Sequence, residues 1–192
     1  MDKRNLDATK IALLDAAEKL MTACDDPTLV TSRAIAKESG VNAAMINYCY
    51  GSREALLLEV FNRIQEEYTV SNPKLLRILQ QNLSPKEKLI EIHIESIKLM
   101  LTHFNYVKAI TKHVLINRKI NADRKSVVFI MEHFRNHKTE AECRMIAFEI
   151  SSLHELAVLR HEEIKETCGI DLKDDASLRN YVTGHINMFL GD

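Results

Sequence analysis

The side chains with the clearest chemistry lie on one face of a short predicted helix around residues 42–48. Asn42, Ala43, Ala44, Asn47 and Tyr48 are left to point outward when the apolar residues beside them turn inward. An asparagine amide can form two hydrogen bonds with adenine, and small residues allow a helix to approach base edges closely. This face therefore suits the major groove of double-stranded DNA.

Two short helices separated by a tight turn are expected to position that face. The patterns run over Ser32–Ser39 and Asn42–Tyr48, and Gly40 between them can adopt the positive φ that such a turn requires. Ile35 of the first helix and Ile46 of the second are expected to face inward and close the interface. The segment is therefore interpreted as a helix-turn-helix.

The same segment resembles the tetracycline-repressor (TetR/AcrR) family. Members typically show T-x-x-x-I-A-x-x-A-G-V, then an aromatic-rich turn and G-S-K-E-x-L; here Thr31–Val41 reads TSRAIAKESGV and Ile46–Leu56 reads INYCYGSREAL. The chain departs from the pattern at three positions. Cys49 stands where His is common, Tyr50 where Phe is common, and Arg53 where Lys is usual. Arg53 keeps a charge that can hold a phosphate oxygen at a helix N-terminus.

The resemblance implies a DNA-binding role for a defined set of residues. Backbone contacts are expected from Arg33, Tyr48 and Arg53, and base contacts from Ser32, Asn42, Ala43, Ala44 and Asn47. Thr31 and Cys49 complete the candidate interface. The implied partner is a palindromic double-stranded operator, and the implied activity is transcriptional regulation, with repression favoured over activation.

Composition supports an all-α chain. Its 192 residues are 46% apolar and 28% charged, with only five glycines and three prolines. Sheet proteins need Gly and Pro at many turns, so long helices with few connections are expected. A net charge of −1 excludes a protein that coats nucleic acid by bulk charge. The four cysteines are far apart, so a cytoplasmic protein without disulfides or a thiolate zinc site is expected. No apolar stretch approaches the length that spans a bilayer, and neither a membrane partner nor a cofactor is expected.

The expected organisation is a three-helix DNA-binding domain over residues 1–70 and a larger helical domain over residues 71–192. The sequence patterns predict helices at Leu6–Ala23, Arg53–Val70, Pro85–Thr102, Tyr106–Asn117, Ala122–Asn136, Thr139–Thr167 and Asp174–Leu190. Ser84, Pro85 and Glu87 form a complete helix start signal.

The last two predicted helices carry more apolar surface than a small domain can cover. Thr139–Thr167 is apolar on two faces, and the resemblance implies that this helix and the final one pair with their copies in a four-helix homodimer interface. The candidate interface residues are Ile146, Ile150, Leu153, Ala157, Leu178, Tyr181, Val182 and Phe189. Ordinary core packing is the alternative for each of them.

The resemblance also implies that the middle helices enclose a pocket for a small-molecule effector, which the sequence does not identify. The candidate lining residues are Met100, His103, Phe104, Val107, Ile110, Phe129, His133 and Phe148. Core packing is the alternative here too. The basic stretch from Lys74 to Lys125 fits an anionic ligand, a surface near DNA, or a simple solvated face.

Two other function classes stay open. His133 and His137 have a spacing that can chelate a metal on a helix, and Glu155, Glu162 and Glu163 lie near His154 and His161. A helical metal-binding protein or enzyme is therefore one alternative, although no G-x-S-x-G elbow, P-loop or HExxH helix appears and neither catalysis nor a metal is expected. A helix-turn-helix adaptor without operator binding is the other alternative.

Overall fold

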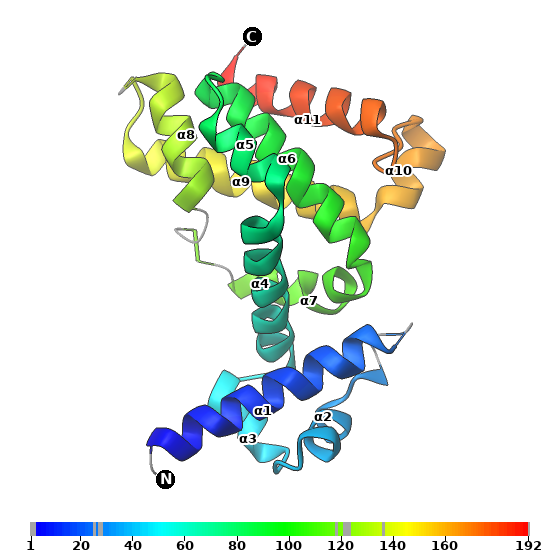
Figure 1. Ribbon diagram of the computed structural model, residues 1–192. Helices are drawn as coiled ribbons and strands as arrows, with labels where there is room; N and C mark the ends of the chain where they lie inside the picture. Colours follow the sequence, from blue (N-terminus) through cyan, green and yellow to red (C-terminus); the bar gives the residue numbers. More distant parts are fainter. Residues whose placement is uncertain are drawn as a thin grey trace. The chain divides into compact units, whose positions relative to one another are not determined.

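Helices account for the regular structure of the chain. The computed structural model describes residues 3–24, 26, 29–117, 119–120, 124–135 and 137–191. Within those ranges every regular element is helical, which confirms the all-α prediction. The chain divides into two compact units, and Figure 1 shows the helices of both. Unit 1 comprises residues 1–68 and 103–116, and unit 2 comprises residues 69–102 and 117–192.

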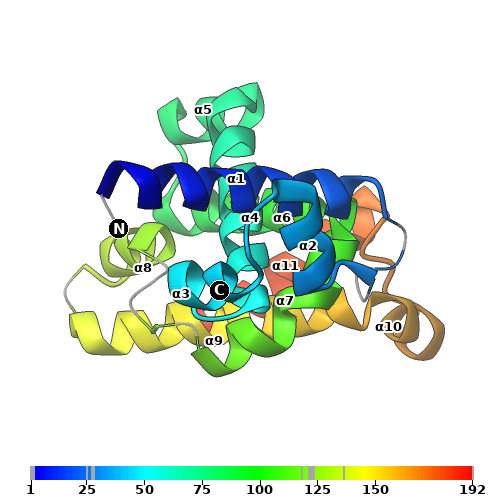
Figure 2. The ribbon, with the colours of Figure 1, turned by 90° about the horizontal axis from the view of Figure 1, so that it is seen from below.

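Unit 1 is built around the first helix of the chain. Its helices are α1 (Lys3–Thr22), α2 (Ser32–Ser39), α3 (Ala44–Tyr50), most of α4 (Arg53–Ser71) and most of α7 (Phe104–Asn117). Both α2 and α3 pack against α1 (Figure 2). The shared core contains Leu13, Ala17, Ile35, Ile46 and Leu56, all of them fully buried.

The presence of α7 in unit 1 has a local explanation. Tyr106 is buried, and its ring packs against Phe61 of α4 with ring centroids 6.3 Å apart. The Tyr106 hydroxyl donates to the carbonyl of Glu18 at 3.4 Å, and Asn105 Nδ2 donates to the carbonyl of Cys24 at 3.2 Å. These bonds fix α7 to the C-terminal part of α1. The functional division near residue 70 stays a prediction.

Unit 2 is a helical bundle centred on α6. Its helices are α5 (Pro73–Gln80), α6 (Pro85–Thr102), α8 (Arg124–Phe134), α9 (Glu140–Leu159), α10 (His161–Cys168) and α11 (Asp175–Leu190). Helix α6 packs against α5, α8, α9 and α11. The predicted bounds of α6 are confirmed. Ser84 N–H donates to Glu87 Oε2 at 2.7 Å, and Glu87 N–H donates to Ser84 Oγ at 3.2 Å, as a capping box requires.

The predicted continuous helix from Thr139 to Thr167 is wrong, because the chain breaks it at Arg160. Thr139 caps the start as expected, but α9 ends at Leu159 and α10 begins at His161. The buried ring of His161 hydrogen-bonds through Nδ1 to the carbonyl of Val158 at 3.0 Å. In a continuous helix that carbonyl accepts from a backbone N–H four residues later, so the side chain competes with the helix.

Two other predicted helix bounds are also corrected. Helix α8 ends at Phe134 rather than at residue 136, and Arg135 follows with a positive φ of 46°. Asn72 and Pro73 end α4 but also start α5, which the sequence patterns missed. Asn72 Oδ1 accepts from the backbone N–H of Lys74 at 2.9 Å, and Pro73 occupies the first turn of the new helix.

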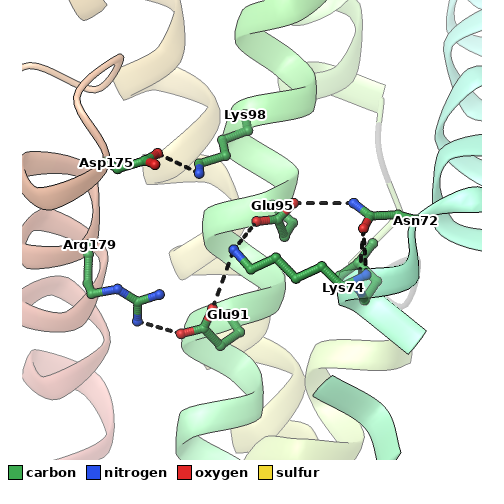
Figure 3. A network of polar contacts seen from close by, with 8 residues as sticks. Asn72, Lys74, Glu91, Glu95, Lys98, Asp175 and Arg179 are labelled. Carbon is green, nitrogen blue, oxygen red and sulfur yellow. Dashed lines mark hydrogen bonds and ion pairs between the residues drawn. The ribbon is translucent and has the colours of Figure 1, made fainter. Parts of the chain in front are cut away.

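A network of charged side chains ties α5, α6 and α11 together (Figure 3). Glu95 of α6 is only 4% exposed, and it accepts from Lys74 Nζ at 2.6 Å and from Asn72 Nδ2 at 3.3 Å. Lys74 also lies 3.9 Å from Glu91, which in turn pairs with Arg179 of α11. Burial of the Glu95 carboxylate is tolerated because an ammonium and an amide lie against it.

Candidate nucleic-acid interface

The two short helices α2 and α3 form the expected helix-turn-helix. Thr31 caps α2, and its Oγ1 accepts from the backbone N–H of Ala34 at 3.1 Å. Gly40 ends α2 with a φ of 67°, in the left-handed region that favours glycine. Val41 N–H then donates to Ser39 Oγ at 3.3 Å, which holds the turn between the helices. The buried side chains of α2 and α3 face α1, so their other faces are left to solvent.

The outer face of α3 carries the predicted base-reading residues. Ala44 and Asn47 are exposed, and Tyr48 is 69% exposed. Asn42 Oδ1 accepts from the backbone N–H of Ala44 at 2.9 Å, so this side chain fixes the start of α3. Bidentate pairing with adenine needs an amide oxygen as acceptor, and this bond competes for the oxygen of Asn42. Asn47 is therefore the stronger candidate for that contact.

The remaining candidate residues differ in how accessible they are. Arg33 is exposed in the first turn of α2, beside the cap residue Thr31. The side chains of three others are only partly exposed, namely Ser32, Ala43 and Cys49. A long guanidinium at the start of α2 suits a phosphate contact. These roles stay predictions.

Arg53 has a structural use in addition to its predicted phosphate contact. Its Nε donates to the carbonyl of Val30, and its Nη1 lies 2.9 Å from Glu54 Oε1. The side chain is only 21% exposed. Arg53 thus joins the start of α4 to Val30, the residue before the N-cap of α2. This bond helps to fix the position of α2.

Tyr50, which stands where Phe is common in the family pattern, also positions the unit. Its hydroxyl donates to the carbonyl of Lys10 in α1 at 2.8 Å. Burial raises the pKa of Tyr50 to about 12, with smaller contributions from nearby Cys49 and carboxylates, so the hydroxyl stays protonated and able to donate. The bond fixes the end of α3 to α1. No spacing rule in the sequence pairs two residues that are this far apart in the chain.

The candidate pocket residues are divided between the two units. Unit 1 contains His103, Phe104, Val107 and Ile110, and unit 2 contains Met100, Phe129, His133 and Phe148. Val107 and Ile110 are buried in the core of unit 1. Burial lowers the pKa of His103, whose ring lies edge-on to Tyr106. A role for these residues in effector binding stays a prediction.

The candidate dimer residues have different degrees of burial within unit 2. Leu153 is 43% exposed, and Ile146, Tyr181 and Phe189 are half-buried. The other four are buried inside the unit, namely Ile150, Ala157, Leu178 and Val182. The same two helices expose Met145, Leu156 and Met188, which the sequence-based set omitted.

The two histidines whose spacing could chelate a metal do not share a helix. His133 is the penultimate residue of α8, and its Nε2 lies 2.9 Å from the carbonyl of Leu190 at the end of α11. His137 lies beyond the end of α8. In the part of the chain that the structure describes, no group of three or more His, Cys, Asp or Glu side chains has an arrangement that could hold a metal ion.

Two comparisons with known proteins give matches. Residues 13–60, which span α1 to α4, match the model of the family described as "Bacterial regulatory proteins, tetR family". A crystal structure of a TetR transcriptional regulator from Rhodococcus sp. RHA1 is 14% identical, with a TM-score of 0.62 and 98% of each chain covered. A TetR-like transcriptional regulator from the same organism is also 14% identical, with a TM-score of 0.53 and coverage of 96% and 97%.

Curated protein sequences contain no significant match to the chain. Among the described residues, no helix combines the length and hydropathy that a bilayer-spanning segment needs.

Proposed function

We infer that the chain belongs to the tetR family of bacterial regulatory proteins, and on this premise we propose that it is a homodimeric repressor that binds a palindromic operator. The observation that carries the proposal is the exposed face of α3, where Asn47 and Tyr48 stand beside Ala44. Small and amide side chains on that face fit base edges in the major groove. Arg33 on α2 adds a cation for the phosphate backbone.

The mode of binding depends on a few positioned contacts. The net charge of −1 gives no long-range attraction to DNA. Tyr50 and Arg53 hold α3 and α2 in place through bonds to the carbonyls of Lys10 and Val30. A preorganised pair of helices loses little entropy on docking, which supports affinity without bulk charge.

Dimerisation is proposed through α9 and α11. These two neighbouring helices expose four large apolar side chains, namely Met145, Leu153, Leu156 and Met188. Exposed apolar residues grouped in this way are typical of an association surface. A second copy related by a two-fold axis covers the same apolar side chains on both chains. It also supplies a second α3, which a palindromic operator requires.

Leu153→Glu is expected to convert the dimer to a monomer. The substitution places a like charge from each chain in a surface that loses water on association, and truncating or charging a central contact costs several kcal/mol of binding energy. Sedimentation at micromolar concentration measures the change. Leu79→Glu is the matched control, because Leu79 is an exposed leucine on α5. A Leu153→Glu chain that still sediments as the wild type contradicts this interface.

The effector is proposed to be a small molecule that releases the operator. A ligand shifts the equilibrium by the difference between its affinities for two states, and here the state it favours holds the two reading units at the wrong spacing. The family premise supports this role, and Met100, Phe129 and Phe148 of unit 2 stay candidate contacts. The proposed function is not catalytic and implies a cytoplasmic protein.

Selection of bound duplexes from a random DNA pool tests the function. We expect enrichment of one two-fold-symmetric sequence whose half-sites are centred about one helical turn, or a multiple of it, apart. A screen of small molecules for release of that duplex then tests the effector. Enrichment of no sequence supports the adaptor alternative instead, and a stoichiometric metal content without DNA affinity supports the metal-protein alternative.

A further inference from the structure

Three histidines from three helices of unit 2 are hydrogen-bonded in series. His93 Nδ1 of α6 lies 3.0 Å from His154 Nδ1 of α9, and His154 Nε2 lies 2.8 Å from His185 Nδ1 of α11. At the other end, Ser126 Oγ of α8 lies 3.4 Å from His93 Nε2. The histidine chain, defined as His93, His154 and His185, thus connects α6, α9 and α11 through ring nitrogens alone.

Most of the histidine chain is buried. His154 is 1% exposed and His93 is 6% exposed, whereas His185 is half-buried. The ring of Tyr181 stacks on His185 with centroids 5.9 Å apart, and Phe189 lies edge-on to His185 at 5.4 Å. Protons from solvent therefore have their shortest route at the α11 end.

The number of protons on the three rings determines whether both ring-to-ring hydrogen bonds of the histidine chain can form. Each neutral imidazole has one N–H, and each link between two rings holds one proton between two nitrogens. The two links take two protons, and the outer nitrogens of His93 and His185 take at most one each. Both links therefore survive with three protons, when all rings are neutral, or with four. A fifth proton places two N–H groups against each other and breaks a link.

Few ionisable groups act on His154, the central ring of the histidine chain. The ionisable groups that act on His154 are His93 and His185, and no carboxylate of the described residues is among them. Glu155 follows His154 directly in sequence but projects about 100° further around α9. Three ion pairs involve charged residues of α6 and α11, namely Glu91–Arg179, Glu95–Lys74 and Lys98–Asp175. On α8, Glu132 is exposed, and on α11 the phenol of Tyr181 faces His185.

The energetics of the histidine chain favour neutral rings. Burial, together with His93 and His185, lowers the pKa of His154 to about 2. Burial also lowers the pKa of His185. Both shifts have the sign expected when a low-dielectric interior disfavours the imidazolium form.

We propose that the histidine chain is an acid-operated switch of unit 2, which joins α6, α9 and α11 when its rings are neutral and releases them when acid adds protons. The first added proton enters a mostly buried group of rings, and the next breaks a link between two helices. The switch goes beyond the proposed function, because it belongs to unit 2 whether or not unit 1 binds DNA.

The expected pH dependence has a definite sign. An unfolded histidine titrates near pH 6.5, and a buried neutral histidine titrates lower, so the unfolded chain binds more protons below pH 6.5. The stabilisation is fully present above pH 6.5 and is lost as the pH falls. For His154 alone, the unfolding equilibrium constant of unit 2 should rise roughly 30-fold between pH 7.5 and pH 5.0. Hydrogen exchange of α9 and α11 amides in the full chain, with EDTA present, measures this opening.

Variants isolate the contribution of the histidine chain. His154→Met should abolish the roughly 30-fold rise of the unfolding equilibrium constant between pH 7.5 and pH 5.0. This expectation holds whether or not the variant is less stable than wild type at pH 7.5. His185→Gln, at the more accessible end, should remove the smaller contribution of His185 and serves if His154→Met does not fold. His137→Gln is the matched control, because His137 is exposed. The proposal is overturned if the unfolding equilibrium constant depends on pH equally in wild type, His154→Met and His185→Gln. Stabilisation of wild type, but not of His154→Met, by added Zn²⁺ also overturns it in favour of a metal site.

Discussion

Asn47→Ala is expected to lower the affinity for the selected operator by about tenfold to a hundredfold per half-site. A bidentate amide–adenine pair contributes about 1–3 kcal/mol of discrimination, and Asn47 is exposed on the outer face of α3. Binding titrations of wild type and variant on the operator, and on operators with each base pair changed in turn, measure the effect. The variant should lose its preference at one base pair in each half-site while keeping its preferences elsewhere.

Two comparisons make the Asn47 result specific. Asn82→Ala removes an equivalent amide from an exposed position between α5 and α6, and its operator affinity should equal that of wild type. Asn42→Ala should reduce affinity through a different route, because Asn42 Oδ1 holds the N–H of Ala44 at the start of α3. If Asn47→Ala binds every operator variant as wild type does, α3 does not read bases through this residue.

Lys74→Met is expected to lower the free energy of unfolding of unit 2 by about 3 kcal/mol at pH 7. The Glu95 carboxylate is 4% exposed and lies 2.6 Å from Lys74 Nζ, so the variant removes the ammonium from a buried charge. Removing one partner of a buried ion pair typically costs about 3–5 kcal/mol. The lower end applies here, because the Lys74 side chain is 44% exposed and because Asn72 Nδ2 still donates to Glu95. Urea unfolding followed by circular dichroism measures the loss.

The same change at an exposed ion pair provides the control. Arg144→Met removes a cation that pairs with Glu140 one turn away on the surface of α9, and it should cost no more than about 0.5 kcal/mol. The double variant Lys74→Met/Glu95→Leu should recover most of the loss, because two apolar side chains leave no charge buried. A double variant as unstable as Lys74→Met alone shows that packing at α5, rather than the buried charge, determines the cost.

Local signals made part of the fold predictable from sequence. The Ser84–Glu87 capping box determined the start of α6, and the glycine at position 40 located the turn between α2 and α3. These signals act within three or four residues, so no tertiary information is needed to interpret them. The break at Arg160 was not predictable, since it depends on the burial of His161 and on its bond to Val158.

The candidate site shows the same distinction between local and distant partners. The outward face of α3 follows from helical spacing once Ile46 is placed inside. The bond from Tyr50 to Lys10 joins residues 40 positions apart, and the bond from Arg53 to Val30 joins residues 23 apart. The histidine chain joins residues 61 and 31 apart. Partners at such separations are determined by packing, which a single sequence does not reveal.

Sequence-selective DNA binding is the central claim, and one competition experiment tests it most directly. The wild-type chain is titrated with the selected operator and with a shuffled duplex of the same composition, at about 150 mM salt because phosphate contacts alone weaken with salt. We predict that the operator binds at least about 1,000-fold more tightly than the shuffled duplex, as specific DNA-binding proteins do. Equal affinity for the two duplexes contradicts the account.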